Sequence, residues 1–422
     1  MLYKGQHFMS YQIRIFAWCF YLVAIAGAAP TELHIWKSTA GTSLEARATS
    51  VEDGLVTLET AAGQVVKLKV EMLVEADRAL LVTHFADKAA VIPSVAVVPG
   101  QVLGPVEAGG SHYFYYVPKS VKPGRKVPLL FFTGAGNGDA GRLAKFQEGA
   151  EICSWIIAIS VECKNELPDA EYITHTQRCL DHLLATQPVD KSRLYFTGNS
   201  GGARVAFTNS VKFKGAGVLA IIAGAAPGEI QRKMDYYFIT GATDYNRSGM
   251  ALSFKEGKSS AAFRIHPGSH DDGPPWLQTE GMIWLQTKWA IRSKSTGPER
   301  EEFDNAAMTW VENLAKDQDY RAGWWTNHLT TGGLTPAAKS RAAKLTQELG
   351  AKPTTIAYID GISSLEKFAI EVLAEGPQFS PACFDHTSPA IQKAVDKLLE
   401  RHATTPWVKD VLAALKNKTG NG

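Results

Sequence analysis

The residues best suited to chemistry lie in the stretch 193–206, RLYFTGNSGGARVA, which has Ser200 at its centre. An apolar run that predicts a buried strand leads into Gly198-Asn199-Ser200-Gly201-Gly202, and a helical pattern follows. A serine at the tip of such a turn adopts a strained backbone, so its neighbours must have little or no side chain. The turn also points the first amides of the helix at the reacting oxygen. The pattern therefore predicts that Ser200 is a nucleophile.

A serine hydroxyl is a weak nucleophile, so it needs a base, and the base needs an orienting acid. We predict His270 as the base, because it follows the last expected strand and precedes the closing helix; His266, at the strand end, is the alternative. We predict Asp244 as the acid, because a loop of small residues joins it to the penultimate strand; Glu229 is the alternative. The carboxylate would fix the tautomer of the imidazole and stabilise its charged form.

The elements that must position these residues lie in the region 107–296, where apolar strands alternate with helices. Strands are expected at residues 113–117, 127–132, 156–161, 194–196, 218–222, 236–239 and 262–265, and helices at 171–185 and 276–289. Continuous apolar runs are typical of strands covered on both faces. The fold class we predict is therefore α/β, with a doubly wound, mostly parallel sheet.

The turn at residues 198–202 has the G-x-S-x-G pattern of a nucleophile elbow. This elbow, the chain order serine, aspartate, histidine and the expected sheet resemble the α/β-hydrolase family. The compact core, the export signal described below and the short link from Ala223 to Asp235 look most like polysaccharide-side-chain esterases and polyester depolymerases. The resemblance implies an exported serine hydrolase that cleaves carboxylic esters through an acyl-enzyme. It implies no metal and no organic cofactor.

The resemblance also implies an oxyanion hole built from two backbone amides. One belongs to Gly201, which follows the nucleophile, and the other to Ala135 in the loop 133–138, with Gly136 as the alternative. Glycines suit this loop because its backbone must approach the substrate closely. Thr133 stands where many family members have histidine, so the hydrogen bonds that support the loop should differ.

Two other functions remain open from the sequence. A serine peptidase of the prolyl-oligopeptidase type would use the same residues, but such enzymes usually carry a large propeller, and none fits in 422 residues. A hydrolase-fold binding protein without activity is the other alternative, which Thr133 and the N-terminal unit described below both favour.

The N-terminal segment 1–29 predicts a secretory signal peptide. Lys4 and Arg14 precede an apolar run that ends in Ala26-Gly27-Ala28-Ala29, where cleavage is expected. The run is short for a membrane span. We therefore expect a secreted or periplasmic protein that has no membrane contact after cleavage.

Residues 31–85 predict a small β-rich unit, because short apolar runs alternate with turn signals. Trp36, Gly41, Gly63 and the run 54–58 resemble the SLA homology domain, a small SH3-like barrel. The resemblance implies a binding module, so a protein partner is expected for this unit. Residues 86–106 contain Pro93, Pro99-Gly100 and Gly104-Pro105 and are expected to form a linker.

Residues 297–422 predict successive helices, either as an appendage of the hydrolase region or as a separate domain. Thr335-Pro336 and Ser388-Pro389 are expected helix starts. Ser363-x-x-Glu366 resembles a capping box and predicts a further helix start. Trp324-Trp325 is expected to be a buried aromatic pair rather than a platform for a sugar.

The composition sets broad limits on partners and redox chemistry. A net charge of +2, without a dense block of Lys and Arg, does not indicate nucleic-acid binding, so the expected partner is a small-molecule or polymer-attached ester. Four cysteines follow the signal (Cys153, Cys163, Cys179 and Cys383), and disulfides and buried free thiols are both open. The sequence contains no C-x-x-C motif, so a zinc or redox site is not expected.

Overall fold

The computed structural model describes residues 30–52, 55–86, 98–122, 124–165, 167–376 and 388–416. The chain divides into two compact units, Met1–Ser94 and Val95–Gly422. The expected signal peptide (1–29) and Cys383 lie outside the described residues. Among the helices that the structure describes, none is long and apolar enough to cross a membrane.

The first unit contains a four-stranded antiparallel sheet in the order β1-β2-β3-β4. Its elements are β1 (His34–Lys37), β2 (Ser43–Glu52), β3 (Leu55–Glu59), β4 (Val65–Lys69), η1 (Val70–Met72) and α1 (Glu75–Ala86). One face of the sheet buries a small core that includes Trp36, Val56 and Leu58. Buried positions alternate with exposed or partly exposed ones along β3, as in a sheet with one buried face.

The SH3-like barrel expected for this unit is not confirmed. Within the described part of the unit, no ladder pairs β1 with β4. An isolated bridge between Ser38 and Leu73 brings the segment after η1 beside the end of β1. The structure thus shows a sheet with one additional contact, and the barrel and its resemblance remain predictions.

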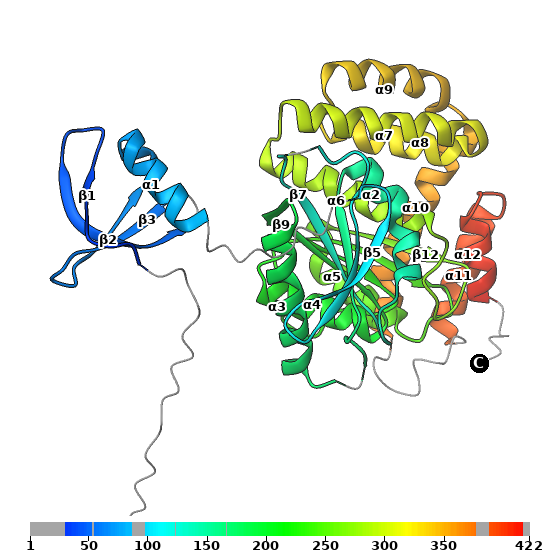
Figure 1. The fold of residues 1–422 in the computed structure, drawn as a ribbon. Coiled ribbons are helices and arrows are strands. Elements are labelled where there is room, and N and C mark those ends of the chain that lie inside the picture. Colours follow the sequence, from blue (N-terminus) through cyan, green and yellow to red (C-terminus); the bar gives the residue numbers. More distant parts are fainter. Residues whose placement is uncertain are drawn as a thin grey trace, which may run out of the picture. The chain divides into compact units, whose positions relative to one another are not determined.

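The second unit is built on an eight-stranded sheet in the order β12-β11-β10-β9-β7-β8-β6-β5 (Figure 1). The strands are β5 (Val102–Glu107), β6 (His112–Tyr116), β7 (Val127–Thr133), β8 (Ile156–Ser160), β9 (Val189–Asn199), β10 (Gly217–Ile221), β11 (Asp235–Gly241) and β12 (Ala261–His266). Strand β6 runs antiparallel to β5 and β8, and the other pairs are parallel. The predicted α/β class with a mostly parallel sheet is confirmed, and the arrangement fits an α/β-hydrolase core.

The expected linker at 86–106 is wrong in its last part, because β5 begins at Val102 and forms an edge of this sheet. Gly104-Pro105 suggested a turn. An edge strand tolerates proline, because one side of its backbone has no partner. The register of β5 against β6 shifts between Leu103 and Val106, so Gly104 and Pro105 lie within a bulge.

Helices cover both faces of the sheet. They are η2 (Ala140–Phe146), α2 (Gln147–Cys153), α3 (Asp169–Thr186), α4 (Gly201–Lys212), α5 (Arg247–Gly257), η3 (Lys258–Ser260) and α6 (Trp276–Ser293). On one face, α3, α4 and α5 bury residues such as Leu180, Phe207 and Phe254. On the other, α2 and α6 bury Ala150 and Met282. The strands between these layers are almost wholly apolar and buried, as a two-faced core requires.

The C-terminal helices extend both layers and belong to the same compact unit. They are α7 (Pro298–Asp317), α8 (Asp319–Thr331), α9 (Pro336–Leu349), α10 (Pro353–Glu371), η4 (Leu373–Glu375), α11 (Pro389–His402) and α12 (Val408–Lys416). Helices α7, α8 and α9 join the core on the α6 face, and α10, α11 and α12 join the core on the α4 face (Figure 1). This region is therefore an appendage of the α/β core and not a separate domain.

The helix starts predicted in this region are partly right. Thr335 and Ser388 precede α9 and α11, and the Ser388 hydroxyl accepts a hydrogen bond from the amide of Ile391. The capping box at Ser363 is wrong, because Ser363 lies inside α10 and donates to the carbonyl of Ile359 at 3.0 Å. Trp325 is fully buried and packs edge-on against Trp324, which is only partly buried, so the expected buried pair is right for Trp325 alone.

Candidate active site

Ser200 occupies the strained turn that the sequence predicts. It joins β9 to α4 with φ 54° and ψ −125°, a conformation that L-residues rarely adopt. A Cβ at Gly202 would lie 2.0 Å from the carbonyl oxygen of Thr133, and a Cβ at Gly198 would lie 2.5 Å from the same oxygen. The two glycines are therefore required because strand β7 passes directly against the turn.

The structure brings Ser200, His270 and Asp244 into one chain of hydrogen bonds. Nε2 of His270 lies 2.9 Å from the Ser200 Oγ, and Nδ1 lies 2.9 Å from Oδ1 of Asp244. The three residues follow the carboxyl ends of β9, β12 and β11, which run parallel and end at one edge of the sheet. Asp244 is fully buried and the His270 side chain is 26% exposed, so this series of hydrogen bonds runs from the interior to the surface.

Asp244 is fixed by donors other than His270. Its Oδ1 accepts from the amide of Asn246 at 2.9 Å, and its Oδ2 accepts from the Thr240 hydroxyl at 3.2 Å. Buried Arg247 donates to the Asp244 carbonyl at 2.9 Å. A buried carboxylate whose oxygens are hydrogen-bonded in this way can hold the imidazole in one orientation.

The alternative base and acid lie outside this chain. His266 is buried, accepts from the amide of Gly268 at its Nδ1 and lies 3.2 Å from the carbonyl of Asp271 through Nε2. Burial lowers the pKa of His266, which favours the neutral ring in a packing role. Glu229 accepts from the amide of Ala226 and from the Thr208 hydroxyl. Neither alternative contacts Ser200 or His270 through a hydrogen bond in the described residues.

The two amides predicted for the oxyanion hole have different surroundings. The amide of Gly201 has no hydrogen-bond acceptor within the described residues, whereas the amide of Ala135 lies 3.4 Å from Oδ1 of Asn199. Thr133 is buried, and its hydroxyl donates to the carbonyl of Gly202 at 2.7 Å. Thr133 thus supports the turn itself, which a histidine at this position would do differently.

Sequence reasoning missed a polar network behind the nucleophile. Asn199 donates to Oδ1 of Asp272 at 3.1 Å, and Lys145 donates to Oδ2 of the same carboxylate at 2.7 Å. The network joins the elbow to η2 and to the loop that carries His270. Asn199 lies in the G-x-S-x-G pattern, but only the fold brings Asp272 and Lys145 to it.

A cavity of about 450 Å³ opens beside Ser200. Its lining residues are Asn165, Leu167, Asp169, Tyr172, Ser200, Gly201, Arg204, Val205, Tyr245 and Asn246. Most of these side chains are polar, and both charge signs are present. The cavity is therefore suited to a hydrophilic molecule rather than to a long aliphatic chain.

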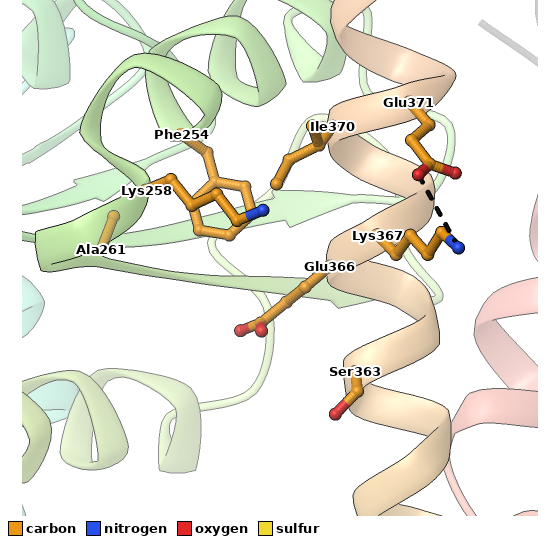
Figure 2. Close-up of a pocket in the computed structure, with 8 residues that line it drawn as sticks. All are labelled: Phe254, Lys258, Ala261, Ser363, Glu366, Lys367, Ile370 and Glu371. Carbon is orange, nitrogen blue, oxygen red and sulfur yellow. Dashed lines mark ion pairs between the residues drawn. The ribbon is translucent and has the colours of Figure 1, made fainter.

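Figure 2 shows a second cavity, of about 380 Å³, between α5 and α10. Lys258 and Glu366 extend into it from opposite sides, and the ring of Phe254 lies beside Lys258 in this view (Figure 2). Ala261, at the start of β12, also lines it, whereas His270 follows the other end of that strand. This cavity is therefore separate from the Ser200 site.

The described residues hold no group of three or more His, Cys, Asp or Glu side chains that could bind a metal ion. Cys153, Cys163 and Cys179 are buried free thiols. Burial raises the pKa of each thiol, so these side chains are poor nucleophiles.

Comparisons with known proteins give structural similarity alone. No family model matches the chain, and neither does any curated protein. A thermostable esterase is 19% identical with a TM-score of 0.34, over 42% of this chain and 58% of that one. FphF, a fluorophosphonate-binding serine hydrolase of Staphylococcus aureus, is 12% identical with a TM-score of 0.36, over 45% of this chain and 99% of that one.

LAE6, an α/β hydrolase from the metagenome of Lake Arreo, is 12% identical with a TM-score of 0.38, over 53% of this chain and 92% of that one. The match to the thermostable esterase covers 58% of that protein, so this chain spans little more than half of its length. These structural neighbours are esterases and serine hydrolases.

Proposed function

We propose that this protein is an exported serine hydrolase that cleaves carboxylic esters. The observation that carries the proposal is the hydrogen-bonded chain from Ser200 through His270 to buried Asp244, with Ser200 in a strained turn beside a cavity. A nucleophile, a base and an orienting acid in this geometry meet the requirements for acyl transfer.

The reaction begins when Ser200 Oγ attacks the ester carbonyl carbon and its proton moves to Nε2 of His270. The oxyanion of the tetrahedral intermediate accepts hydrogen bonds from the amides of Gly201 and Ala135. The Ala135 amide must first give up its contact with Oδ1 of Asn199. The carbon–oxygen bond then breaks, and Nε2 gives its proton to the leaving alcohol. Water, activated by His270, releases the acid and restores Ser200.

The polar cavity supports a hydrophilic substrate, either a small molecule or an ester attached to a polymer. The apolar run before Ala29 supports export to the periplasm or the medium. For the N-terminal unit we keep the role of a binding module for a protein partner. The reaction itself needs no metal and no organic cofactor, and the proposal includes no nucleic-acid partner.

The test is hydrolysis of 4-nitrophenyl acetate by the purified full chain and by its Ser200→Ala and His270→Ala variants. We expect turnover by the wild type and a fall in kcat of about 10⁴-fold or more in each variant. Glu229→Gln is the matched control and should keep the wild-type rate. A folded wild type without turnover would instead support the inactive binding protein, and faster cleavage of a peptide 4-nitroanilide would support the peptidase.

A further inference from the structure

A second hydroxyl reaches the reactive nitrogen of His270. Tyr245 directly follows Asp244, and its phenol oxygen lies 2.8 Å from Nε2. Ser200 Oγ lies 2.9 Å from the same nitrogen. Because Asp244 holds Nδ1, Nε2 is the ring atom through which a proton passes to or from a reactant. Tyr245 therefore touches a reacting atom that the proposed mechanism already uses.

The ring of Tyr245 also packs on the imidazole of His270. The ring centroids are 4.2 Å apart and the planes differ by 24°. The rings are thus nearly parallel, and the phenol oxygen approaches Nε2 over the face of the imidazole. This contact limits rotation of the His270 ring, whose other restraints are Asp244 and Ser200.

The loop that carries Tyr245 is anchored on both sides of this residue. Asp244 is buried, and the amide of Asn246 donates to its Oδ1 at 2.9 Å. The Asn246 side chain donates to the carbonyl of Ile222 at 2.8 Å. Tyr245 also lines the cavity that opens beside Ser200. Its hydroxyl is therefore held at the boundary between the base and the space for substrate.

The Tyr245 hydroxyl lies where it can assist the transfer of a proton to the leaving-group oxygen. The leaving oxygen must come within hydrogen-bond distance of Nε2 to receive the proton that Ser200 gave up. A hydroxyl 2.8 Å from Nε2, on a residue that lines the cavity, is also close to that oxygen. A donor placed there stabilises the charge that develops as the ester bond breaks.

We propose that Tyr245 is a further catalytic residue, whose hydroxyl donates a hydrogen bond to the leaving-group oxygen during acylation. This inference rests on the proposed esterase function. The proton from Ser200 moves through Nε2 to the leaving oxygen as the carbon–oxygen bond breaks, and the phenol keeps its own proton. The role depends on the hydroxyl, whereas the stacking depends on the ring.

The test compares two acetates that form the same acyl-enzyme, 4-nitrophenyl acetate and ethyl acetate. Nitrophenolate leaves without a proton, whereas ethoxide must be protonated as it leaves. In Tyr245→Phe, which keeps the ring, we expect kcat/KM for ethyl acetate to fall about tenfold or more. For 4-nitrophenyl acetate we expect a fall of no more than about threefold, because the proton matters less. Tyr320→Phe, outside the site, is the control and should match the wild type.

Three results would overturn the inference. Equal rates for Tyr245→Phe and the wild type on both esters would leave the hydroxyl without a role. Equal losses on both esters would point to positioning of His270 rather than to the leaving group. A wild type that hydrolyses neither ester would overturn the proposed function as well. A fluorophosphonate labels Ser200 without an alcohol leaving group, so labelling of Tyr245→Phe at the wild-type rate would support the inference further.

Discussion

Two ion pairs in the second unit (95–422) each join a buried carboxylate to a basic side chain, but they differ in what the basic partner faces. In the first, Asp244 is fully buried and His270 is 26% exposed, beside Ser200 and a cavity. In the second, Glu280 and Arg321 are 2% and 3% exposed and lie 2.8 Å apart. Glu280 also accepts from the indole of Trp325, and Arg321 lies over the ring of Trp276.

The comparison teaches that burial of a charge does not by itself mark an active site. Both carboxylates are satisfied by several donors, which is the general requirement for a buried charge. Arg321 is enclosed by protein and joins α8 to α6, so this pair holds the C-terminal helices on the core. His270 instead presents its second nitrogen to the hydroxyls of Ser200 and Tyr245. Only the first pair can exchange a proton with a reactant.

The largest expected effect is on catalysis at the first pair. Asp244→Asn keeps the shape but removes the charge, so the imidazole loses the partner that fixes its tautomer. We expect kcat for 4-nitrophenyl acetate to fall about 10³–10⁴-fold. Acylation and deacylation should both slow, because His270 acts in each step, and the rate of the first turnover under single-turnover conditions measures the acylation part. A loss of less than about tenfold would show that Asp244 does not orient His270 during the reaction.

The next effect is on stability at the second pair. Glu280→Ala leaves Arg321 as an uncompensated buried charge, so the free energy of unfolding should fall by about 3–5 kcal/mol. Urea unfolding followed by tryptophan fluorescence measures this change, and activity per folded molecule should stay at the wild-type level.

Glu302→Ala is the matched control, because it removes an ion pair with Lys122 and Arg125 at the surface. It should cost less than about 1 kcal/mol. If Glu280→Ala lost activity but not stability, the second pair would be catalytic rather than structural, which would contradict the comparison.

The smallest effect concerns His328, which stacks on Trp324 with ring centroids 5.1 Å apart near the second pair. Burial, with Arg264 and Lys288 nearby, lowers the pKa of His328 to about 3. The unfolded chain binds a proton at this residue below about pH 6.5, and the folded chain does not. Stability should therefore be insensitive to this group above that pH and should fall as the pH drops from about 6.5 towards 3.

His328→Phe keeps an aromatic ring and removes this titration. Between pH 7 and pH 5 the variant should lose about 2 kcal/mol less stability than the wild type, as measured by urea unfolding at each pH. Parallel pH dependence in the two proteins would mean that His328 is not buried as a neutral ring.

The sequence predicted the sheet and the residues that follow its strands, because long apolar runs and the glycines of the elbow are local signals. The turn at Ser200 needs Gly198 and Gly202 for reasons that the sequence pattern already carries. His270 and Asp244 follow from their position after particular strands. These predictions required only the order of the expected strands along the sequence and no knowledge of side-chain packing.

Features that depend on packing were not predictable in this way. Ser363 matches a capping pattern, yet the helix continues through it, and its neighbours Ile362 and Leu365 are buried. The same holds for Tyr245 and Asp272, whose neighbours in the site come from distant segments. Spacing along the chain carries no signal for such contacts.

Covalent labelling of Ser200 tests most directly whether the chain of hydrogen bonds activates a nucleophile. The purified full chain is treated with a fluorophosphonate, digested with trypsin and analysed by mass spectrometry. An adduct on the peptide 194–204, with none in Ser200→Ala, is the expected result, and His270→Ala should label far more slowly. A folded wild type that stays unlabelled, or an adduct on another peptide, would contradict the assignment of this site.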